Sequence, residues 1–114
     1  MPSAERHTPK VAILGAGHGA HAMAGHLGME GVPVRVYNQF EEEIVAMREQ
    51  AGVTVQGVIE GFGPVEMVTI DPAPVVSWAD VLMVVVPAFV HRLMAQTCAP
   101  FLRDGQIVIL NPGR

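Results

Sequence analysis

The stretch KVAILGAGHGAHAMAGHLGMEGVPVRVYNQF, residues 10–40, decides the fold of this chain. It opens with the apolar run VAIL at residues 11–14, which predicts a short strand buried on both faces. Three glycines then fall within five positions, and small and apolar residues recur at helical spacing as far as Met29. The valine-rich residues 32–37 predict a second strand. This stretch therefore predicts a strand, a tight glycine turn, a helix and a second strand.

The middle of the chain predicts a helix and then a hairpin. Three glutamates followed by an apolar residue and a later glycine indicate a helix over residues 40–50. Residues 53–70 alternate apolar and polar positions around Glu60-Gly61, which predicts a β-hairpin that ends in a strand toward Ile70.

The last third of the chain continues the alternation. Residues 71–80 hold two prolines and predict a loop with at most a short helix near residues 75–78. After it we expect a strand at 81–86, a helix at 89–101 and a strand at 106–110. Strands that alternate with helices form parallel βαβ units with right-handed crossovers. We therefore predict an α/β fold: a doubly wound, mostly parallel sheet with helices on both faces and a β-hairpin insertion.

Length and composition narrow the class of protein. The chain has 114 residues, enough for one core, and residues 1–9 are polar and predict a flexible tail before a single domain at residues 10–114. Half of the residues are apolar and the net charge is −4, which argues against disorder and against a nucleic-acid partner. No stretch is long enough to span a membrane, and the single cysteine fits a soluble protein of the reducing cytoplasm.

The glycine turn matches a motif with a known physical purpose. Gly15-Ala16-Gly17-His18-Gly19-Ala20 fits G-x-G-x-x-A, which binds the pyrophosphate of a dinucleotide at the N-terminus of a helix. The alternative is a purely structural turn. The motif follows a predicted strand and opens a predicted helix, which is the context that a dinucleotide site requires.

The residue at the end of the second strand bears on the choice of cofactor. Asn38 follows Gly15 by about 20 residues, where an acidic residue would accept the ribose hydroxyls of NAD. A neutral amide does not repel the 2′-phosphate of NADP, but the next residue, Gln39, is not a cation that would bind it. The sequence leaves NADP and NAD both open, with a slight preference for NADP.

Three stretches together resemble the N-terminal domain of opine dehydrogenases, the octopine and nopaline dehydrogenase family. They are VAILGAGHGAHAMAGHL at residues 11–27, VLMVVVPAFVH at residues 81–91 and VILNPGR at residues 108–114. The resemblance implies a Rossmann-type NAD(P)-binding domain and an NAD(P)H-dependent reductive condensation of an amino acid with an α-keto acid. The cofactor-binding residues that follow from motif and resemblance are Gly15, Ala16, Gly17, His18, Gly19, Ala20, Asn38, Gln39, Val86, Pro87, Ala88, Asn111, Pro112 and Gly113.

The resemblance covers the cofactor domain alone. Members of that family carry the catalytic histidine and the substrate site in a second, mostly helical domain, so we expect no catalytic residue here and binding without catalysis. The surface that such a domain would cover should be apolar, which predicts a homodimer. Alternatives are a ketopantoate-reductase-like or glycerol-3-phosphate-dehydrogenase-like enzyme, or a stand-alone dinucleotide sensor.

For the other side chains with reactive groups, the sequence favours structural roles. A metal site is not expected, because no carboxylate or cysteine joins His18, His21 and His26 at ligand spacing. His91 is either a general acid or a helix residue at the rim of the cleft, and the second is favoured because no orienting partner is evident. Cys98 is expected to be buried, and the glutamates at 41–43 to form a solvated turn.

Overall fold

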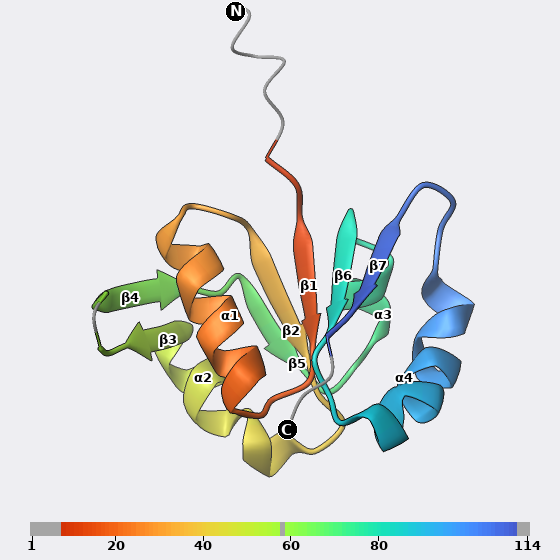
Figure 1. The fold of residues 1–114 in the computed structure, drawn as a ribbon, viewed down its shortest axis with the longest axis horizontal. Helices are drawn as coiled ribbons and strands as arrows, with labels where there is room; N and C mark the ends of the chain where they lie inside the picture. Colours follow the sequence, from red (N-terminus) through yellow and green to blue (C-terminus); the bar gives the residue numbers. More distant parts are fainter. Residues whose placement is uncertain (1–7, 58, 112–114) are drawn as a thin grey trace, which may run out of the picture.

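The structure, a computed structural model, describes residues 8–57 and 59–111 (Figure 1). Five strands form one parallel sheet in the order β5-β2-β1-β6-β7. The central strand β1 is paired on both sides, since Val11 lies opposite Val34 on one side and Val81 on the other. The strands are β1 (Val11–Leu14), β2 (Val34–Tyr37), β5 (Met67–Thr69), β6 (Val81–Val84) and β7 (Ile107–Leu110).

Helices cover both faces of this sheet, as Figure 1 shows. Successive side chains of a strand point to opposite faces. Val11 and Ile13 of β1 accordingly pack with α1 (His18–Met29) and α2 (Val45–Gln50), whereas Ala12 and Leu14 pack with α3 (Ala73–Val76) and α4 (His91–Cys98). The fully apolar run at 11–14 is thus explained by two cores, one on each face. The predicted doubly wound α/β fold is confirmed.

The predicted hairpin is present as a small sheet of its own. β3 (Gly52–Val55) and β4 (Gly61–Pro64) pair antiparallel and lie against α1. Val55 pairs with Gly61, so Gly61 already belongs to β4 and the turn precedes it. Gly61 begins β4, and a Cβ there would lie 2.8 Å from the Met29 Cε atom, the flexible end of a side chain of α1.

Two predicted helices are interrupted. The helix expected at residues 40–50 is a 3₁₀ turn, η2 (Glu41–Glu43), followed by α2, with Ile44 between them in a non-helical conformation (φ −120°, ψ 0°). The helix expected at residues 89–101 consists of η3 (Ala88–Val90), α4 and η4 (Ala99–Phe101). Pro100 lacks an N–H and lies in the first turn of η4, so α4 ends at Cys98.

Within the described ranges, no helix combines the length and the apolarity that a membrane crossing demands. The predicted tail falls on residues 1–9, of which residues 1–7 lie outside the described part. Pro9 is exposed, and β1 begins two residues later.

Candidate functional site

A groove of about 290 Å³ opens at the carboxyl ends of β1, β2 and β6. In a doubly wound sheet ligands bind at this end, beside the strand where the chain reverses direction across the sheet. Here that strand is β1, because the chain first proceeds to β2 and β5 on one side and then crosses to β6 and β7 on the other. The groove is lined by Ala16, Gly17, His18, Gly19, Asn38, Gln39, Phe40, Glu43, Val85, Val86, Pro87, Val90 and Met94.

Most of the residues predicted to bind a cofactor meet in this groove. Gly15 and Ala20 are buried at the ends of the glycine turn and support it. Ala88 is exposed where η3 begins, and Asn111 donates its N–H to the Val84 carbonyl at 2.9 Å; neither is among the lining residues. Pro112 and Gly113 lie outside the described residues.

Gly15 is a glycine because the fold requires it. Its φ is +132°, a conformation that side chains rarely adopt, and a Cβ would collide with the carbonyl oxygen of Val85. Its N–H donates to the Tyr37 carbonyl at 2.9 Å, which fixes the turn to the end of β2. Glycine at this position lets the chain turn away from the end of β1, between the neighbouring strands β2 and β6.

No contact within the described chain requires a glycine at position 17. Its φ of −76° and ψ of −174° suit any residue, and a Cβ there would have no atom of the described chain within 4 Å. The missing side chain instead leaves the backbone open toward the groove. Gly17 caps α1, whose first N–H groups have no partner within the helix. Such N–H groups and the positive end of the helix dipole bind phosphates, so the turn fits a dinucleotide.

The sequence profile of the NAD-dependent glycerol-3-phosphate dehydrogenase N-terminus matches residues 10–111 of the chain. The chain belongs to that family. This match confirms the predicted NAD-binding domain. The predicted resemblance to opine dehydrogenases is confirmed by the similar proteins described next.

Three similar proteins place this NAD-binding domain among dehydrogenases. The opine dehydrogenase of Arthrobacter sp. (strain 1C) is 33% identical over 103 residues, which cover 90% of the chain and 29% of that protein. An octopine dehydrogenase solved with NADH and agmatine is 31% identical with a TM-score of 0.76 over 89% of the chain and 28% of that structure. The glycerol-3-phosphate dehydrogenase [NAD(P)+] of Thioalkalivibrio sulfidiphilus (strain HL-EbGR7) is 33% identical, over 89% of the chain and 30% of that protein. The chain thus spans less than a third of each relative.

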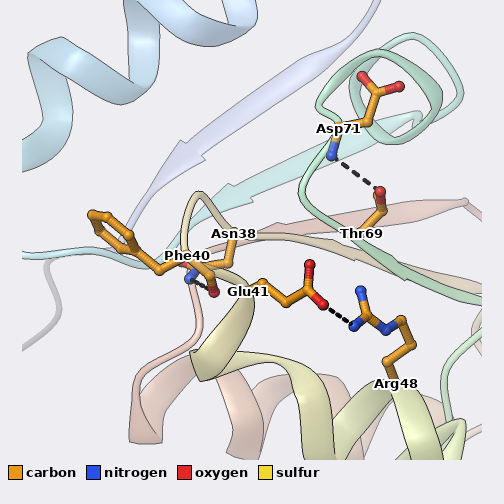
Figure 2. Close-up of polar contacts among 6 residues, drawn as sticks. All are labelled: Asn38, Phe40, Glu41, Arg48, Thr69 and Asp71. Atoms are coloured by element: carbon orange, nitrogen blue, oxygen red, sulfur yellow. Dashed lines mark hydrogen bonds and ion pairs between the residues drawn. The ribbon is translucent and has the colours of Figure 1, made fainter.

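Asn38 lies at the predicted place in this NAD-binding domain, but its side chain is directed into the turn that follows β2. Only 6% of the residue is exposed. Its Nδ2 donates to the carbonyl of Phe40 at 3.1 Å, which Figure 2 shows, and to Oε1 of Glu43 at 2.7 Å. The Asn38 N–H donates to the Thr69 carbonyl of β5. Asn38 therefore holds the turn at the edge of the groove.

Five lining residues were not predicted from the sequence, namely Phe40, Glu43, Val85, Val90 and Met94. Phe40 is half exposed and contributes to the wall of the groove beside Asn38. Glu43 was expected to be part of a solvated turn; it also lines the groove, because η2 folds it back against Asn38. For Phe40 and Glu43, the only indication in the sequence is their closeness to the end of β2.

The remaining candidate residues, His91 and Cys98, do not line the cofactor groove. The Nε2 atom of His91 lies 3.1 Å from the Val86 carbonyl oxygen, and the ring lines a second, apolar groove between α4 and the β6–β7 edge. Burial raises the pKa of the Cys98 thiol to about 11, so the thiol stays protonated and unreactive at neutral pH. In the ranges 8–57 and 59–111, no three potential metal-ligating side chains converge.

Proposed function

We propose that the chain is the cofactor-binding domain of an opine-dehydrogenase-like oxidoreductase, which reductively condenses an amino acid with an α-keto acid. The observation that carries the proposal is Gly17, an open position in a groove at the carboxyl ends of parallel strands. The similarity to an opine and an octopine dehydrogenase supports this substrate class.

The proposed site divides between the two halves of the dinucleotide. The N–H groups of Gly17, His18 and Gly19 face the pyrophosphate, because they belong to the turn and the first residues of α1. Asn38 and Gln39 border the adenosine ribose at the end of β2. In this proposal Val86, Pro87 and Ala88, after β6, flank the nicotinamide. Asn111 borders the nicotinamide and substrate cleft, a role that the resemblance also implies for Pro112 and Gly113, which lie outside the described residues.

The domain supplies binding and orientation in this reaction. An amine and a keto group lose water to form an imine, and reduction of its C=N bond gives the new secondary amine. The bound dinucleotide supplies the hydride. The groups that bind substrate and transfer protons belong, in this proposal, to a further domain of the full protein, so the chain alone binds cofactor without catalysis. A buried free thiol, Cys98, fits the cytoplasm as its compartment.

A calorimetric titration of the chain with NADH tests the proposal. We expect saturable binding that Gly17→Val abolishes, because the added side chain fills the space where the pyrophosphate approaches the backbone. Ala22→Val is the matched control, since Ala22 is exposed on α1 and does not line the groove. Absence of binding, or binding that survives Gly17→Val, would contradict the proposal.

A second candidate is a glycerol-3-phosphate-dehydrogenase-like enzyme. The family to which the chain belongs and the 33% identity to such an enzyme favour it. A longer protein that contains this chain would separate the two in one assay. Oxidation of NADH that requires both an amino acid and an α-keto acid supports the opine reaction, whereas reduction of NAD by glycerol 3-phosphate supports the alternative.

A further inference from the structure

Glu43 occupies the part of the groove where the adenosine ribose is proposed to lie. It belongs to η2, the 3₁₀ turn that directly follows the end of β2, and it is one of the lining residues. Its Oε1 accepts a hydrogen bond of 2.7 Å from Nδ2 of Asn38. Because Asn38 is buried and also bonded to the Phe40 carbonyl, it fixes the position of the Glu43 carboxylate.

The described part of the groove offers this carboxylate no competing cation. Neither lysine nor arginine occurs among its lining residues. Arg48, on the following helix, forms an ion pair of 2.7 Å with Glu41 (Figure 2), and Arg35 forms one of 2.8 Å with Glu66. Among the residues that line the groove, the one carboxylate is thus an anion that Asn38 holds in place.

We infer that Glu43 makes this site selective for NAD over NADP, an inference that rests on the proposed function. A carboxylate accepts hydrogen bonds from ribose hydroxyls, and it repels the 2′-phosphate that distinguishes NADP. The acidic residue expected at the end of β2 is therefore supplied five positions later, by η2. Asn38 acts through Glu43 as a positioning residue. This reverses the slight preference for NADP drawn from Asn38 alone.

Calorimetric titrations with NADH and with NADPH test the inference. The wild-type chain should bind NADH at least about tenfold more tightly, the scale of one neighbouring charge near a protein surface. Glu43→Gln keeps an oxygen that accepts from Asn38 but removes the charge, and it should raise NADPH affinity about tenfold. Glu42→Gln is the matched control, because Glu42 is exposed in the same turn and outside the groove; it should leave both affinities unchanged.

The role of Asn38 is tested in two backgrounds. Asn38→Ala should weaken the preference for NADH in the wild-type chain and leave the preference unchanged in Glu43→Gln, because its effect passes through Glu43. An NADH-to-NADPH affinity ratio that Glu43→Gln does not change, or equal binding of both cofactors by the wild type, overturns the inference alone. If neither cofactor binds, the proposed function fails and the inference with it.

Discussion

At the scale of single residues, two glycines of one motif have different tasks. Gly15 holds a positive φ and touches the backbone of Val85, whereas Gly17 holds an ordinary extended conformation beside open space. The motif G-x-G-x-x-A gives both the same letter. The turn therefore combines a glycine that the fold needs with one that only a ligand explains.

This difference predicts losses of stability of different size at the two positions. Gly15→Ala should lower the free energy of unfolding by about 2–3 kcal/mol, because it combines a disfavoured φ with a backbone collision. Gly17→Ala should cost less than about 1 kcal/mol, the change expected at an exposed N-cap. Urea unfolding of the cofactor-free variants measures both. Equal losses at the two positions would show that Gly17 also serves the fold.

At the scale of elements, α1 and the hairpin meet through their backbones. The buried residues of α1 are all small: Ala20, Ala24, Gly25 and Gly28. A Cβ on Gly28 would lie 2.5 Å from the Pro64 carbonyl oxygen, and one on Gly63 of β4 would collide with the Gly25 carbonyl. Glycines in a helix usually weaken it; here they allow the hairpin to pack directly on the helix.

Gly28→Ala should therefore destabilise the chain by about 1–3 kcal/mol, although this substitution stabilises an isolated helix by about 1 kcal/mol. Ala22→Gly, on the exposed side of α1, is the control for helix propensity alone and should cost about 1 kcal/mol. Chemical denaturation of both variants gives the comparison. A gain in stability from Gly28→Ala would mean that the hairpin does not pack closely on α1.

At the scale of the whole molecule, one edge of the sheet is apolar and uncovered. All four residues of β7 are exposed, from 42% at Ile109 to 58% at Leu110. Among the described residues, β7 pairs with β6 along one edge and with no strand along the other. Beside β7 lies the apolar groove of about 90 Å³ between this edge and α4. An exposed apolar edge strand is a template for pairing with another strand.

We propose that two copies of the chain associate through β7 about a two-fold axis, which would cover both edges. Ile107→Lys or Ile109→Lys should shift the chain toward monomer, because a buried lysine opposes the contact. Ile59→Lys is the matched control, since Ile59 is 58% exposed in the hairpin turn, away from this edge. Light scattering across a concentration series measures the mass, and a monomer at high concentration would exclude the dimer.

The order of strands and helices was determined by the sequence itself, because it depends on local features. Apolar runs at residues 11–14 and 81–86 predicted β1 and β6, and small residues at helical spacing predicted α1. The glycine turn between a strand and a helix predicted the place of the groove. Each of these features lies within a few residues of what it predicts. Breaks at Ile44 and Pro100 changed the shape of two helices without changing this order.

Only the tertiary structure decided what depends on contacts between distant segments. A Cβ on Gly15 would collide with Val85, and the strand β4 that α1 accommodates begins more than 30 residues after the end of α1. Glu43 is close to Asn38 in sequence, yet only the structure shows that it lines the groove and accepts a hydrogen bond from Asn38. A residue's type and spacing indicate which chemistry it can perform, but its role depends on which backbone and side chains the fold brings beside it.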